Sequence, residues 1–184
     1  RRGVWRSRSL RRGALLLALL PASVLAAADV GWDALLLLPG LVAAGAGMLF
    51  GINAFCLDGS GSTWIASLPH RPSTTYRART QVVAEVCGAS VLVAVAAGAV
   101  RAPAPTSTQL VCFVSVVVVS VVRVTASCMR WSVENPHRAT LVGPRDAPAP
   151  PGAMAGYSLR LAVPAALIGL VFTGLSLLGS PLLA

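Results

Sequence analysis

Residues 108–128 read TQLVCFVSVVVVSVVRVTASC, and the choice between helix and strand for this stretch decides the fold class. Its run of valines is typical of a buried strand in a water-soluble protein. The stretch also has about the 20 residues that an α-helix needs to cross a bilayer core about 30 Å thick. A lone strand in lipid leaves its backbone groups unpaired, so we predict a membrane-spanning helix with Arg123 reaching toward the cytoplasmic surface.

Four further apolar runs of similar length lie along the chain, at about residues 13–30, 34–57, 81–100 and 161–183. The 184 residues are 55% hydrophobic and 11% charged, with a mean hydropathy of +0.75. Soluble domains carry about 25% charged residues, so this chain is not an ordinary soluble domain. We predict an all-α, polytopic transmembrane bundle of about five spans in one domain, with its longer loops at 58–80 and 129–157.

The basic residues indicate how the spans are oriented. All 15 are arginines, against 6 acidic residues, which gives a net charge of +9. Six arginines precede the first span, three lie between spans two and three, and five lie between the end of span four and the start of span five. These are fourteen of the fifteen, and the exception is Arg101. Because cytoplasmic flanks carry the excess of arginine, we predict a cytoplasmic N-terminus and a multi-pass protein of the cytoplasmic membrane. The charge therefore marks topology, and no nucleic-acid partner is expected.

The first apolar run has a second interpretation. A basic region, an apolar stretch and the small residues Ala26, Ala27 and Ala28 also describe a secretory signal peptide. The other four spans keep their predicted topology in either case. The sequence does not begin with Met, so we expect a fragment of a longer protein.

Small residues recur at four-residue spacing in the second apolar run, at Ala43, Gly47 and Gly51. They would share one face of a helix, where small residues allow close packing against a neighbouring helix or subunit. An alanine-rich chain also produces such patterns by chance, and both interpretations stay open.

Glu85 is the one acidic residue well inside an apolar run. A carboxylate in lipid is costly and therefore marks a candidate functional site. Since Glu85 lies about one turn from the cytoplasmic end of its span, it can instead reach water or pair with Arg123 on another helix. A single carboxylate does not make a proton relay.

The loop at 58–80 contains a short pattern of apolar residues. Ser60 or Ser62 can cap a short helix in which Trp64, Ile65 and Leu68 share one face, until Pro69 ends it. Such an element could lie on the membrane surface, dock into a groove of a partner protein, or be a solvated turn. The loop at 129–157 is rich in Pro, Gly and Ala, which predicts an extended connection.

Catalytic and metal-binding patterns are missing. Without lysine there is no Walker A motif, no Schiff base and no lysine base. His70 and His137 stand alone in loops, and the four cysteines show no CxxC spacing. We therefore expect no enzymatic activity, no metal site and no cofactor.

Two short motifs carry a resemblance to a known family. Asn53, Phe55, Asp58 and Gly59 form an Asn-x-Phe-x-x-Asp-Gly pattern at the inner end of a span, followed by Trp64 and the Leu68-Pro69 pair. A Pro-Pro-Gly-Ala-Met segment at 150–154 leads into Tyr-Ser-Leu-Arg at 157–160. Together they resemble actinobacterial permease subunits of ATP-binding-cassette type 2 transporters. The family usually has six or more spans, so a five-span chain again indicates a fragment.

The resemblance implies a membrane-embedded export subunit energised by a separate ATP-binding cassette subunit, with a second permease copy or half completing the transporter. The ATPase would dock on the loop at 58–80, with Asp58 and Gly59 fixing the turn and Trp64, Ile65 and Leu68 forming the docking face. A small polytopic scaffold or assembly protein without transport activity is the alternative. The apolar spans specify no substrate.

Overall fold

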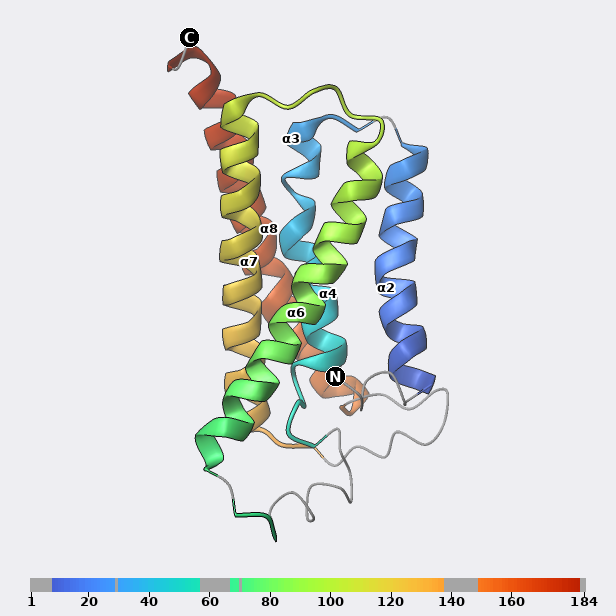
Figure 1. Cartoon of the computed structure of the whole chain (residues 1–184), viewed down its shortest axis with the longest axis vertical. Helices are drawn as coiled ribbons and strands as arrows, with labels where there is room; N and C mark the ends of the chain where they lie inside the picture. Colours follow the sequence, from blue (N-terminus) through green and yellow to red (C-terminus); the bar gives the residue numbers. More distant parts are fainter. Residues whose placement is uncertain (1–7, 29, 57–66, 70, 138–148, 183–184) are drawn as a thin grey trace.

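The computed structural model describes residues 8–28, 30–56, 67–69, 71–137 and 149–182, and this part of the chain is all-helical. Its elements are α2 (Arg8–Ala27), α3 (Trp32–Leu35), α4 (Leu38–Phe50), α6 (Pro72–Ala99), α7 (Ser107–Glu134) and α8 (Pro151–Leu182). The chain runs up and down the bundle, with α3 and α4 together making the second crossing (Figure 1). Four crossings are long and apolar enough to span a membrane, and α2 adds a shorter apolar segment, Leu15–Ala27. The prediction of an all-α bundle with about five spans is confirmed, and the chain is a multi-pass membrane protein.

Helix α4 is central to the bundle, because it contacts α2, α6, α7 and α8. Glycines allow two of these neighbours to come close. A Cβ added at Gly40 would lie 2.6 Å from the carbonyl oxygen of Ala165 in α8. A Cβ added at Gly47 would lie 2.6 Å from Val124 Cγ1 in α7. Close packing of this kind brings helices together in lipid, where the hydrophobic effect supplies little association energy.

The second crossing is interrupted near its start. Pro39 has no backbone N–H and therefore donates no helical hydrogen bond to Leu35. At the interruption, Leu37 N donates to Ala34 O at 3.2 Å, a bond across three residues rather than four. Helix α4 ends at Phe50, and residues 51–56 form turns. The continuous span predicted at 34–57 is thus two helices and a turn segment.

Three helices extend past the apolar runs that predicted them. Helix α6 begins at Pro72, so residues 72–80 are helical although the sequence predicted a loop at 58–80. Proline is favoured at the first helical position, and Arg71 before it is extended. Helix α7 continues to Glu134, where the Asn135-Pro136 pair disfavours further helix, and α8 begins at Pro151. Both ends of the predicted connection at 129–157 are therefore helical, and so are residues 8–12, before the first predicted span.

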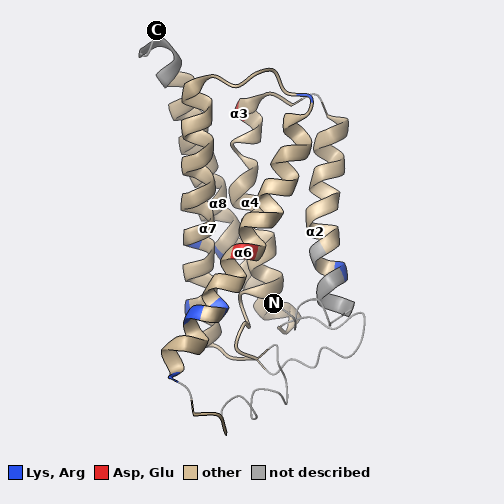
Figure 2. Cartoon of the chain, in the orientation of Figure 1, with Lys and Arg blue, Asp and Glu red and all other residues tan. Residues whose placement is uncertain are grey.

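The arginines gather toward one end of the bundle (Figure 2). We call this the basic end; it holds the first residues of α2, α6 and α8 and the last residues of α4 and α7. At 1.5 Å per residue, Arg123 lies about 16 Å from the end of α7, and Arg160 lies about 14 Å from the start of α8. The remaining lengths, about 24 Å for α7 and about 33 Å for α8, are close to the thickness of a bilayer core. By this measure, α7 and α8 extend beyond the bilayer core at the basic end.

The opposite end is held together by polar contacts. Trp32 Nε1 donates to Pro103 O at 2.7 Å, which ties α3 to the connection between α6 and α7. The Asp33 backbone carbonyl accepts from Thr173 Oγ1 at 3.2 Å, and its carboxylate accepts from Ser176 Oγ at 3.3 Å. These bonds fix α8 against α3. The end of the bundle opposite the basic end is therefore stabilised by side-chain hydrogen bonds as well as by packing.

The outward faces of the helices are apolar. On α7 the exposed residues follow helical spacing, and a similar stripe runs along α8, in agreement with a surface that faces lipid. The members are Val111, Val114, Val118 and Val122 on α7 and Val163, Leu167, Leu170 and Val171 on α8.

Candidate docking face at the basic end

Asn53 fastens the turn after α4 to the segment that follows α7. Its side chain is almost completely buried, with 1% exposed. Asn53 Nδ2 donates to His137 O at 2.7 Å, and His137 N donates to Asn53 Oδ1 at 3.3 Å. Two residues on, Phe55 N donates to Ser132 Oγ at 3.2 Å. The Asn-x-Phe part of the family-like motif thus joins two helix ends that are far apart in the sequence.

Phe55 also ties the first turns of α6 to the same point. Its ring stacks on Tyr76, with centroids 6.1 Å apart and planes 21° apart. The Arg79 guanidinium lies over the Phe55 ring, 5.3 Å from its centroid, and Arg79 Nη1 donates to Ala54 O. A cation over an aromatic face is attracted by the ring quadrupole. The turn after α4 is therefore held from two sides, by α6 and by the end of α7.

A second aromatic contact brings in α8. Trp131 near the end of α7 stacks on Tyr157 near the start of α8, with centroids 5.0 Å apart. His137 meets the same tyrosine edge-on at 6.3 Å. Together with the contacts around Asn53 and Phe55, these residues link α4, α6, α7 and α8. We call them the basal cluster: Asn53, Phe55, Tyr76, Arg79, Trp131, Ser132, His137 and Tyr157.

Charged side chains surround the basal cluster on the surface. Arg71, Arg77 and Arg130 are exposed. Arg130 Nε bonds Glu134 Oε1 at 2.7 Å, and this hydrogen bond raises the pKa of Arg130. Because the pair is solvent-exposed, it contributes little to stability. Arg71, just before α6, and Arg77, in its first turns, leave exposed positive charge near the start of this helix.

The predicted docking residues are only partly within the described part of the chain. Asp58, Gly59, Trp64 and Ile65 lie outside the described residues. Leu68 is exposed, and so is Pro69. The docking face of Trp64, Ile65 and Leu68 therefore stays a prediction from the sequence.

The two charges predicted to lie within the membrane are on separate helices. Glu85 on α6 is exposed and accepts from Gln81 Nε2 at 3.0 Å. Arg123 Nη1 on α7 donates to Ser127 Oγ at 2.6 Å, one turn nearer the basic end. Arg123 thus uses a serine of its own helix rather than Glu85, and the direction of this bond agrees with a side chain that reaches toward the interface.

The small residues predicted to pack do not share a single partner. The backbone carbonyl of Ala43 lies 3.6 Å from Cys87 Sγ of α6. Gly47 and Gly51 face α7, and a Cβ at Gly51 would lie 2.6 Å from Cys128 Cβ. By contrast, a Cβ at Gly88 in the third apolar run would meet nothing within 4 Å.

Most of the basal cluster was missed by sequence reasoning, which took His137 as an isolated loop residue and did not single out Tyr76, Arg79, Trp131 or Ser132. A signal was available: aromatic residues lie at or beside the basic ends of four apolar runs, and membrane proteins collect aromatic residues near the ends of their spans. In the part of the chain that the structure describes, no group of three or more His, Cys, Asp or Glu residues is arranged to hold a metal ion.

Comparison with protein-family models, with curated proteins and with solved structures finds no match to this chain.

Proposed function

We propose that this chain is the membrane-spanning subunit of an ATP-driven exporter in the cytoplasmic membrane, and that a separate ATPase subunit binds its basic end. The observation that carries the proposal is the basal cluster. It links the inner ends of α4, α6, α7 and α8 through named contacts, so a protein bound at this end acts on four helices at once.

Charge supports the side and the kind of partner. The positive-inside rule makes the basic end cytoplasmic, which is where ATP is available. The exposed Arg71 and Arg77 near the start of α6 favour an acidic docking surface on the partner. The chain contains no lysine, so a Walker A site would have to be on the other subunit.

The interior favours an assembly of more than one copy or half. Helix α4 contacts all four other long helices, and glycines bring its backbone close to α7 and α8. A transport path along the axis of one bundle would have to displace α4. The path is therefore expected between this chain and a second permease copy or half.

The packed interior equally suits the alternative function, a small membrane scaffold or assembly protein. A scaffold needs neither a path nor ATP. The two functions differ in whether ATP hydrolysis by a bound partner depends on this chain.

We expect the double substitution Trp64→Asp with Leu68→Asp to abolish co-purification of the ATPase while leaving membrane insertion intact. Leu68 is 42% exposed, so a charge there costs the bundle little, whereas it disrupts an apolar docking contact. The measurement is affinity purification from membranes, followed by assay of ATP hydrolysis in proteoliposomes containing both proteins.

The matched control is Val100→Asp with Ala104→Asp, which places two charges on exposed positions at the opposite end. This control should retain the ATPase. Retention of the ATPase by the Trp64/Leu68 variant would rule out the docking face. ATP hydrolysis by the partner that is unaffected by this chain would favour the scaffold.

A further inference from the structure

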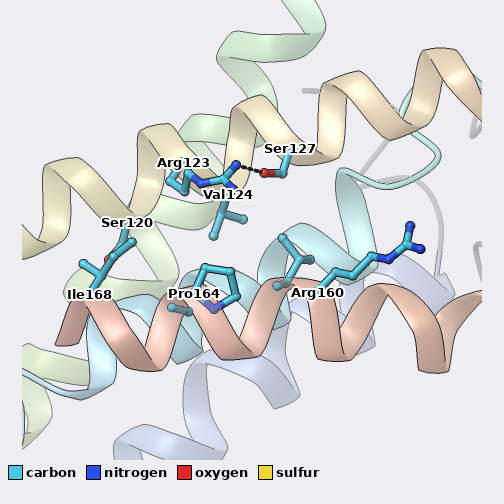
Figure 3. A pocket seen from close by; sticks show the side chains of 9 residues that line it. Ser120, Arg123, Val124, Ser127, Arg160, Pro164 and Ile168 are labelled. Carbon is cyan, nitrogen blue, oxygen red and sulfur yellow. Dashed lines mark hydrogen bonds between the residues drawn. The ribbon is translucent and has the colours of Figure 1, made fainter. Parts of the chain in front are cut away.

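A pocket lies between α7 and α8 on the side of the bundle away from α2 (Figure 3). Its lining includes two arginines from different helices, and Ser120 lies at the end of the pocket farther from the basic end (Figure 3). Apolar residues of α8 form the rest of its floor. The lining residues are Ser120, Arg123, Val124 and Ser127 from α7 and Arg160, Leu161, Pro164, Ala165 and Ile168 from α8.

The two arginines line the pocket from different helices, and Arg160 lies nearer the basic end than Arg123 (Figure 3). Helices α7 and α8 run in opposite directions, and Arg123 and Arg160 are about 16 Å and about 14 Å from their helix ends at the basic end. Both side chains are exposed, and that of Arg160 extends along α8 toward the basic end (Figure 3). The two guanidinium groups give this side of the pocket a positive charge, and basic pockets between membrane-spanning helices attract anionic lipid headgroups.

Ser120 supplies a second, independent observation. The residue is 1% exposed, and within the described part of the chain its Oγ has no hydrogen-bond partner. A buried hydroxyl without a partner is costly, and such groups are expected to have a ligand or water. Ser120 lines the pocket about one helical turn, or about 4.5 Å, deeper than Arg123. In a phospholipid, the ester carbonyls lie below the phosphate by a similar distance.

The walls of the pocket favour a lipid over a small soluble anion. The exposed apolar residues Val119 on α7 and Leu167 on α8 are the chain neighbours of the lining residues Ser120 and Ile168. Pro164 and Ile168 continue the apolar floor toward the bilayer centre. A free anion would contact only the polar side chains, whereas a phospholipid would also cover the apolar residues of the pocket.

We propose that this pocket binds an anionic phospholipid of the inner leaflet. Arg123 and Arg160 hold the phosphate, and the Ser120 hydroxyl donates to an ester carbonyl. One acyl chain lies over Pro164 and Ile168. Ser127, which accepts from Arg123 Nη1, positions that guanidinium in the pocket.

The test is native mass spectrometry of the purified full chain titrated with dioleoylphosphatidylglycerol. We expect one phosphatidylglycerol to be retained by the unmodified chain. The double variant Arg123→Gln with Arg160→Gln should weaken binding at least about tenfold, because charge-assisted hydrogen bonds are the strong ones. The charge-matched control, Arg71→Gln with Arg77→Gln, removes two exposed arginines outside the pocket and should bind as the unmodified chain does.

Ser120→Val provides a variant that keeps both charges. It should weaken phosphatidylglycerol binding severalfold while leaving the lipid-free chain at least as stable, because it removes an unpaired buried hydroxyl. Equal retention of dioleoylphosphatidylcholine would overturn the proposal, and so would displacement of the lipid by millimolar inorganic phosphate, which would show a free-anion site. The proposal would also be overturned if the double arginine variant and Ser120→Val both bound phosphatidylglycerol as the unmodified chain does.

Discussion

Replacing Gly40 by alanine is expected to destabilise the bundle by about 2 kcal/mol or more, a large effect for one methyl group. A Cβ at this position would lie 2.6 Å from the carbonyl oxygen of Ala165 and 3.0 Å from its carbonyl carbon. Both atoms belong to the backbone of α8, so no side chain can rotate away. Helix α8 as a whole would have to move from α4.

Gly88→Ala is the matched control, because a Cβ at Gly88 meets nothing within 4 Å. In a helix interior, alanine is favoured over glycine by about 0.5–1 kcal/mol, so this variant should be as stable as the parent or slightly more stable. The measurement is the free energy of unfolding in mixed micelles titrated with a denaturing detergent.

A second comparison separates backbone contact from side-chain contact. At Gly47 a Cβ would meet Val124 Cγ1 at 2.6 Å and Cys128 Sγ at 2.9 Å, and both are side-chain atoms. Truncation by Val124→Ala should therefore relieve much of the strain of Gly47→Ala. No truncation of Ala165 should rescue Gly40→Ala. Equal free energies of unfolding for Gly40→Ala and Gly88→Ala would contradict the close approach of α4 and α8 at Gly40.

The substitution Asn53→Ala is expected to lower the free energy of unfolding by about 2–3 kcal/mol and to loosen the basic end. It removes a bond in each direction between the Asn53 amide and the His137 backbone, at 2.7 Å and 3.3 Å. The backbone groups of His137 then lose their partner at a partly buried site, which adds a desolvation cost to the loss of the bonds. The ends of α4 and α7 should separate more readily as a result.

Asn135→Ala provides the control, since Asn135 is an exposed asparagine on the same segment. Exposed substitutions of this kind usually change stability by less than about 0.5 kcal/mol. Unfolding in mixed micelles measures the cost, and hydrogen exchange of residues 51–56 reports loosening of the turn. Equal stability of the two variants would show that Asn53 does not fasten the turn to α7.

The helices themselves could be predicted because the bilayer fixes their length. Each apolar run at 34–57, 81–100, 108–128 and 161–183 became a helix or a pair of helices in the described chain. Helix ends were predicted poorly, because apolar run length marks the lipid boundary and not the end of the helix. Pro72 and Pro151 start α6 and α8 beyond that boundary, and both were available as helix-start signals.

The contacts at the basic end could not be predicted from one sequence. Asn53 and Phe55 were recognised as a motif, but their partners His137, Ser132 and Tyr76 follow from how the helices are packed. The same holds for Gly40, whose neighbour Ala165 is on α8. Spacing within one helix identifies a face and says nothing about which helix covers it.

Both proposals require the basic end to face the cytoplasm, and cysteine labelling tests this directly. A chain carrying Cys56→Ser provides the background, because Cys87, Cys112 and Cys128 are buried. Arg71→Cys and Ala104→Cys then place single thiols on exposed positions at opposite ends of the bundle.

With a membrane-impermeant maleimide on intact cells, we expect Ala104→Cys to be labelled, and Arg71→Cys to be labelled only after permeabilisation. Labelling of Arg71→Cys in intact cells, with protection of Ala104→Cys, would contradict the predicted topology. The basic end would then be inaccessible to a cytoplasmic ATPase and to lipids of the inner leaflet.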